Sequence, residues 1–163
     1  MSETQTDLDR EGMVAPWLAG VIGGLVGALG FGLVMVFVIP APVLEVAIPN
    51  MYGIGATPDN PAELFGWIIH LSHGAILGVV FAALLRVEAV GTVATDTART
   101  AVVGLLYGIV IWVVLAVIVM PIWLGAVGFP GAPPLPNVSE LSLLGHALYG
   151  VLLGIVYDVL TRP

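Results

Sequence analysis

Four long runs of apolar residues follow one another along the chain, separated by shorter polar or proline-rich segments. The runs cover residues 14–39, 63–85, 98–120 and 140–160. Each run reaches the roughly 20 residues that a helix needs to cross a hydrocarbon core about 30 Å thick. The pattern therefore predicts an all-α membrane protein with four transmembrane helices.

The second half of the sequence repeats features of the first half at fixed offsets. A shift of 81 residues places Gly23, Gly27, Phe31, Pro40 and Pro49 on Gly104, Gly108, Trp112, Pro121 and Pro130. A shift of 76 residues places His70, Gly74 and Gly78 on His146, Gly150 and Gly154, and His73 on Tyr149. Because each repeat holds two spans, both repeats enter the membrane in the same orientation. The sequence thus predicts a tandem repeat of two helical hairpins with a pseudo-two-fold axis along the membrane normal, in which span 2 faces or neighbours span 4.

This repeat divides the chain into parts of different character. The predicted parts are an acidic cytoplasmic tail (1–13), a first repeat (14–97) with an outer loop (40–62) and a cytoplasmic linker (86–97), and a second repeat (98–163) with an outer loop (121–139). Since proline has no N–H and clashes with the preceding turn, Pro40 and Pro121 should end or kink the first and third helices. The apolar segments that follow them should form short helices or loops over the mouth of the bundle.

Glycines at four-residue spacing in the first and third spans indicate close approach between helices. They are Gly20, Gly23, Gly24, Gly27, Gly104 and Gly108. We interpret them as packing positions.

All four arginines fall on one side of this topology, and the chain has no lysine. They are Arg10 before span 1, Arg86 and Arg99 between spans 2 and 3, and Arg162 after span 4. Because positive residues favour the cytoplasmic side, both termini should be cytoplasmic and the protein a multi-pass protein of the cell membrane.

Composition supports a membrane location and removes several function classes. Hydrophobic residues make up 59% of the chain and charged residues 9%, against roughly 25% charged residues in soluble domains. The absence of cysteine and lysine excludes disulfides, iron–sulfur ligation, Schiff-base chemistry and a Walker lysine. The net charge of −7 argues against a nucleic-acid partner and indicates a halophilic, archaeal source.

The candidate chemistry lies in two histidine-bearing stripes. On a helix, His70 and His73 share a face with Gly74 and Gly78, and His146 shares one with Gly150 and Gly154. Ionisable residues inside a membrane are costly and usually face the bundle interior. Asp158, near the cytoplasmic end of span 4, has no acidic counterpart in the first repeat and is expected to be an unremarkable interfacial residue.

Three interpretations of the histidines stay open. In the first, each neutral imidazole hydrogen-bonds a partner helix or an outer-loop carbonyl. In the second, His70 and His146 ligate haem b, and Gly74, Gly78, Gly150 and Gly154 leave room for the macrocycle. In the third, His70, His73 and His146 form a metal or proton site, together with Glu63 or Glu140.

The four spans, their GxxxG openings and the echo of "GWIIHLSHG" in "LLGHALYG" resemble a known family. It comprises small haloarchaeal and bacterial membrane proteins of uncharacterised function, some of them labelled histidine kinases. The resemblance covers the whole chain and implies no catalytic residues. The kinase label lacks support here, since the sequence contains no nucleotide-binding domain and a phosphoryl group in an apolar helix would be costly.

These patterns predict a non-catalytic integral membrane subunit. Its expected role is an accessory or haem b-carrying component of a respiratory or other redox assembly, in contact with lipid and within a homo-oligomer or larger membrane complex. The alternative is a small transporter or channel module that passes an ion or small solute between the repeats. Catalytic activity of its own is not expected, because the spans contain no nucleophile–base pair.

Overall fold

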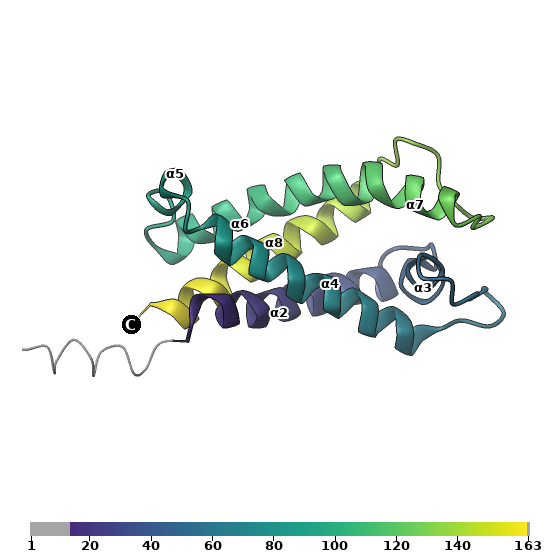
Figure 1. Ribbon diagram of the computed structural model, residues 1–163, viewed down its shortest axis with the longest axis horizontal. Coiled ribbons are helices and arrows are strands. Elements are labelled where there is room, and N and C mark those ends of the chain that lie inside the picture. The colour runs from purple at the N-terminus through teal and green to yellow at the C-terminus, as the bar shows by residue number, and fades with distance from the viewer. Residues whose placement is uncertain (1–13, 163) are drawn as a thin grey trace, which may run out of the picture.

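The computed structural model describes residues 14–162, which form a helical bundle without strands in that part of the chain (Figure 1). The elements are α2 (Pro16–Phe37), η1 (Val43–Ala47), α3 (Ile48–Asn50), α4 (Glu63–Leu84), α5 (Glu88–Gly91), α6 (Thr97–Ile111), η2 (Trp112–Val119), α7 (Met120–Ala126) and α8 (Glu140–Thr161). The predicted acidic tail, residues 1–13, lies outside the described residues.

Four helical stretches are long and apolar enough to cross a membrane, which confirms the all-α, four-span prediction. They are Pro16–Phe37, Glu63–Leu84, Thr97–Ala126 and Glu140–Thr161. The third stretch differs from its predicted bounds, because the helix runs through Pro121 to Ala126 and does not end before the proline.

A change of helical register carries the third span through Pro121. Residues Trp112–Val119 form a π-helix, whose hydrogen bonds join residues five apart. The nitrogen of residue 121 would pair with the carbonyl of Ala116 in π register or that of Val117 in α register, and proline offers no N–H to either. Asn137 supplies both partners, since its backbone N–H donates to Val117 O (3.0 Å) and its Nδ2 to Ala116 O (3.3 Å).

The segment after α2 has a similar arrangement around Pro49. α2 ends at Phe37, before Pro40, and the short helices η1 and α3 follow, as the sequence predicted. Pro49 has no N–H for the carbonyl of Glu45, which accepts the backbone N–H of Ala62 at 2.9 Å instead. Both proline-rich segments are therefore tied down by backbone hydrogen bonds just before the next spanning helix begins.

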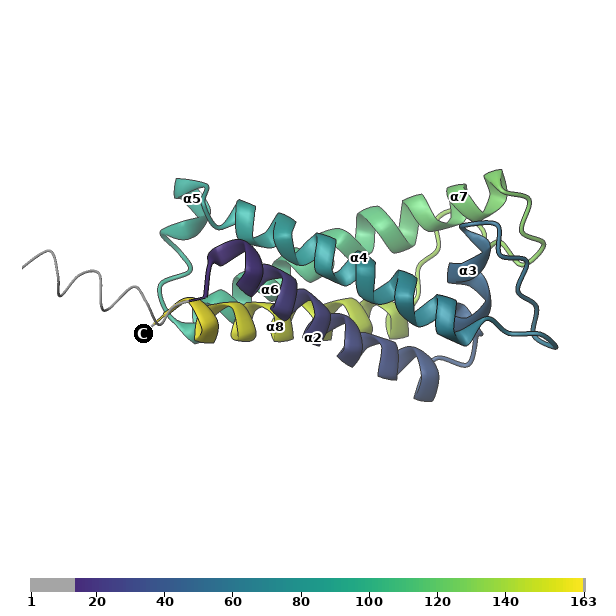
Figure 2. The same cartoon turned by 60° about the horizontal axis from the view of Figure 1, so that its bottom comes forward.

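The four spanning helices pack as a chain of neighbours in which α2 contacts α4 and α8, and α8 also contacts α6 (Figure 2). Glycine lets the backbones approach closely at these crossings. Gly24 lies against Gly74 between α2 and α4, and Gly104 lies against Gly150 between α6 and α8. The interpretation of the spaced glycines as packing positions is confirmed, because Gly23 and Gly27 likewise face Leu153 and Tyr149 of α8.

Helix α4 makes no comparable contact along α8 or α6, so the expectation that spans 2 and 4 lie side by side is wrong. The reason is that α2 packs against both α4 and α8. Tyrosine side chains span the remaining distance to α4: Tyr149 Oη donates to Gly74 O at 2.9 Å, and Tyr107 Oη donates to Leu77 O at 2.8 Å.

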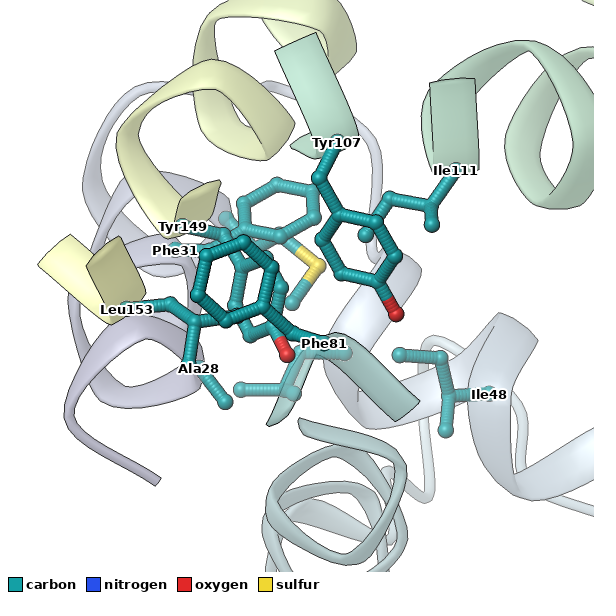
Figure 3. Packing of buried hydrophobic residues seen from close by; sticks show 10 residues of the cluster. Ala28, Phe31, Ile48, Phe81, Tyr107, Ile111, Tyr149 and Leu153 are labelled. Carbon is teal, nitrogen blue, oxygen red and sulfur yellow. The ribbon is translucent and has the colours of Figure 1, made fainter. Parts of the chain in front are cut away.

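An aromatic core fills the interior where these tyrosines lie (Figure 3). Phe81 and Leu153 are fully buried, and the Phe81 ring lies 5.4 Å from that of Tyr107. The core separates two ends of the bundle. The start of α2, the end of α8 and α5 lie at one end, and α3 and α7 lie at the other (Figure 1).

Candidate functional site

A cavity of about 1000 Å³ lies toward the α3 and α7 end of the bundle, on the other side of the aromatic core from α5. Its walls come from α2, α4, η2, α7 and α8, and the two proline-rich segments close it at the end. All three histidines of the chain contribute to its lining, and no arginine, aspartate or glutamate among residues 14–162 does. We call it the histidine cavity.

His70 holds a fixed place in the wall contributed by α4. The residue is 8% exposed, and its Nε2 lies 2.9 Å from the carbonyl oxygen of Ala28 on α2. A carbonyl can only accept, so the Nε2–H of His70 is the donor. The Phe31 ring packs edge-on against the imidazole at 5.5 Å. The hydrogen bond from His70 to Ala28 O ties α4 to α2, as the first interpretation of the histidines expected.

His146 reaches the same phenyl ring from α8. Its ring centroid lies 4.6 Å from that of Phe31, and its Nδ1 lies 2.8 Å from the carbonyl oxygen of Ser142 one turn earlier. The Nδ1–H is again the donor, but to its own helix and not to a partner helix. The structure thus brings the repeat-related histidines together around Phe31.

His73 occupies a different part of the cavity, near its mouth. Its Nε2 forms a 2.6 Å hydrogen bond with Tyr52 Oη, and the Tyr52 ring lies 5.6 Å from that of Trp123 on α7. Trp123 Nε1 in turn donates to Met51 O at 2.9 Å. We call His73, Tyr52 and Trp123 the aromatic bridge, because they join α4 to α7 through the first proline-rich segment.

The predicted metal ligands do not come together as one set. Among residues 14–162, no three His, Cys, Asp or Glu side chains lie close enough together to hold a metal ion. His70 and His146 meet at Phe31, whereas His73 belongs to the aromatic bridge.

The glycines predicted to make room for haem b are covered by neighbouring helices. A Cβ added at Gly74 would overlap the Ala28 methyl group, and one at Gly78 would overlap Gly20 O. Gly150 and Gly154 face the backbone of α6 in the same way. With Phe31 against both imidazoles, this arrangement does not fit a macrocycle between His70 and His146, and haem ligation stays a prediction from the sequence.

A second polar cluster at the α5 end was missed. Asp158 is 2% exposed and accepts hydrogen bonds from the hydroxyls of Thr97 (2.7 Å) and Thr100 (2.9 Å) on α6. Its Oδ1 also lies 2.7 Å from Arg162 Nε. The expectation that Asp158 is an unremarkable interfacial residue is therefore wrong. Thr97 and Thr100 are three residues apart, and Asp158 and Arg162 are four apart, so each pair lies on one helix face. These spacings are the sequence feature that could have predicted the cluster.

Comparison with known proteins places the chain in a family without assigning an activity. No curated protein and no solved structure matches it. A family of unknown function (DUF6789) matches residues 14–163. This agrees with the expected resemblance to an uncharacterised family, whereas the haloarchaeal source stays a prediction. Because the match covers nearly the whole chain, the protein belongs to the DUF6789 family of unknown function.

Proposed function

We propose that this protein is a non-catalytic integral membrane protein that binds an apolar small molecule in the histidine cavity. The observation that carries the proposal is the cavity itself, which has about 1000 Å³ of space and a lining that is mostly apolar. Ligand sites in proteins are typically concave, apolar and roughly 300–1000 Å³ in volume, with a few polar groups that orient the ligand.

Access from the lipid phase supports an apolar ligand. The backbones of α4 and α6 lie farther apart than those of the other neighbouring helices, and both helices contribute residues to the lining. Ile76 on α4 lines the cavity and is also 62% exposed on the surface of the bundle, so it lies between the cavity and that surface. A molecule dissolved in the hydrocarbon core could enter sideways without crossing water.

A continuous path for an ion or polar solute has less support. On the α5 side of the cavity, the fully buried Phe81 and Leu153 fill the interior together with Tyr107. The transporter or channel alternative would need these side chains to move apart. We keep the accessory role in a redox membrane assembly, within a homo-oligomer or larger complex, as a proposal supported by the sequence patterns.

The tandem repeat is also a proposal, and equivalent contacts support it. Gly24 contacts Gly74 O and Gly78 Cα, just as Gly104 contacts Gly150 O and Gly154 Cα. These contacts match at a shift of 80 residues for the first partner, one less than the shift of 81 used in the sequence comparison, and at 76 for the second. An exact pseudo-two-fold axis is not supported, since the backbones of α2 and α8 pack closely whereas α6 reaches α4 through the Tyr107 side chain.

For the topology, we propose that the α5 end faces the cytoplasm and that the protein resides in the cell membrane. Arg86 follows α4, Arg99 lies in the first turn of α6, and Arg162 follows α8, so the three described arginines gather at this end. The fourth, Arg10, lies outside the described residues.

Filling the histidine cavity tests the proposed function. Leu115 lines the cavity, whereas its neighbour Val114 is 46% exposed on the surface and does not line it. The probe is hexadecyl methyl ether carrying a diazirine on its chain, added to protein in phosphatidylcholine nanodiscs. We expect photolabelling of cavity peptides, identified by mass spectrometry, to fall at least fivefold in Leu115→Trp and to be unchanged in Val114→Trp. Labelling spread evenly over the lipid-facing surface, and equal in both variants, would contradict the proposal.

A further inference from the structure

Two of the histidines on the wall of the histidine cavity have their ring N–H groups engaged. His70 Nε2 donates to Ala28 O and His146 Nδ1 donates to Ser142 O. A neutral imidazole carries one N–H, so the other ring nitrogen of each histidine is an acceptor. The neutral form is the one expected in this setting, because no acidic side chain lines the cavity to balance a charge.

Three further lining side chains also have their N–H or O–H groups engaged in hydrogen bonds. Asn50 Nδ2 donates both of its protons to backbone carbonyls, Val46 O at 2.8 Å and Ala56 O at 2.7 Å. Trp123 donates to Met51 O, and Tyr149 donates to Gly74 O. Asn50 Oδ1 therefore joins the two imidazole nitrogens as an acceptor. The lining serine and threonine hydroxyls can turn to donate or accept, and Asn137 Nδ2 keeps one N–H beyond its bond to Ala116 O.

These acceptors are open to the cavity and are not sealed inside the protein. Among residues 14–162, Trp112 Nε1 is the buried side-chain nitrogen or oxygen atom that has neither a hydrogen-bond partner nor exposed surface. Trp112 does not line the cavity. His70 Nδ1, His146 Nε2 and Asn50 Oδ1 also have no protein partner there, yet none is sealed in this way. Since their residues line the cavity, a bound molecule can reach them.

We infer that the histidine cavity selects a neutral, long-chain molecule whose polar head donates a hydrogen bond, such as an alcohol or a phenol. This inference rests on the proposed function and names its ligand class. An acceptor-only head, such as an ether or ester, would leave the imidazole nitrogens unpaired. A phosphate or ammonium head would find no opposite charge, because the lining holds neither arginine nor acidic residues.

A matched pair of probes tests the selection. Hexadecanol and hexadecyl methyl ether each carry a diazirine at the same chain position. They differ in the head, where the ether has a methyl group in place of the hydroxyl proton. Both are added to the full-length protein in phosphatidylcholine nanodiscs, and labelling of cavity peptides is divided by labelling of the lipid-facing end of α2, where Phe37 is 79% exposed. That division corrects for how much of each probe the bilayer takes up. We expect the alcohol to label the cavity about fivefold more than the ether, the difference that one net hydrogen bond makes.

Variants at His146 identify the acceptor. His146→Phe removes one of the three acceptors and should lower the alcohol-to-ether ratio. His146→Gln can donate to Ser142 O and still present an amide oxygen, so it should restore most of the selection. The control is Val114→Phe, which changes a side chain that is 46% exposed and does not line the cavity, and it should leave the ratio unchanged.

The outcomes separate this inference from the proposed function. Cavity labelling that is equal for the two probes would overturn the selection and leave the binding function standing. Cavity labelling by neither probe above the α2 reference would overturn both. If His146→Phe does not fold, the ratio in the unmodified protein decides the question, and a preference for the ether overturns the inference.

Discussion

At the residue scale, the buried polar side chains of His70 and Asp158 are explained by the carbonyl and hydroxyl groups that they meet. The burial of His70 could be predicted from the sequence, because an imidazole in an apolar span is less costly inside the bundle than in lipid. Its hydrogen bond to Ala28 could not, since the acceptor is a backbone atom 42 residues away on another helix. Asp158 was misjudged for the same reason, as its threonine partners lie on α6.

Removing the Asp158 carboxylate should destabilise the protein. Asp158→Ala leaves two threonine hydroxyls and Arg162 without their acceptor. We expect a loss of about 2 kcal/mol in the free energy of unfolding, less than for a fully buried ion pair because 36% of the Arg162 side chain is exposed. The measurement is reversible unfolding in mixed micelles.

An exposed ion pair at the same end provides the control for Asp158. Asp96 and Arg99 lie 3.4 Å apart with most of both side chains in solvent, and Asp96 also caps α6 by accepting the Arg99 N–H. Asp96→Ser keeps a capping oxygen and should leave the free energy of unfolding nearly unchanged. Equal effects of the two substitutions would show that the buried cluster contributes nothing special.

At the element scale, the bounds of α2, α4 and α8 were predicted within a few residues, whereas those of the third span were not. Proline rules predicted a break or kink at Pro121, but the helix continues because Asn137 occupies the carbonyls that the proline leaves free. A compensation of this kind comes from a loop far along the chain. Local sequence patterns therefore could not show it.

A double-mutant cycle tests this compensation. Asn137→Ala should destabilise the protein by about 1 kcal/mol, because Ala116 O loses its side-chain donor. In a Pro121→Ala background the new backbone N–H can serve one of the two carbonyls, so the cost of Asn137→Ala should fall by about half. Unfolding measurements on the four proteins give the coupling. The same cost in both backgrounds would mean that Asn137 does not compensate for the proline.

At the scale of the whole molecule, the number of spans and their close packing were predictable, but the order of neighbours was not. The spacing of small residues indicates which face of a helix packs against another helix. Which helix covers that face depends on how all four helices pack together. Gly20 and Gly24 meet α4, whereas Gly23 and Gly27 meet α8, and these pairs look alike in the sequence. The cavity beside α4 follows from that order of neighbours and was not predicted.

The orientation can be checked with single cysteines, since the natural chain has none. Asp59→Cys and Pro134→Cys lie in exposed parts of the two proline-rich segments, and Thr95→Cys lies in the exposed linker before α6. On intact cells an impermeant maleimide should label the first two and spare the third, because the arginine-rich end faces inward. Labelling of Thr95→Cys alone would reverse the topology.

The position of α2 also has a consequence for biosynthesis. This helix is made before the other three spanning helices, yet one of its two packing faces is covered by α8, the last of the four. A nascent chain that has inserted α2, α4 and α6 therefore still exposes Gly23 and Gly27 to lipid or to other membrane proteins. Its core closes only when α8 leaves the ribosome, which makes the interval before that moment the time when this protein is most open to mispairing or to capture by an insertion chaperone.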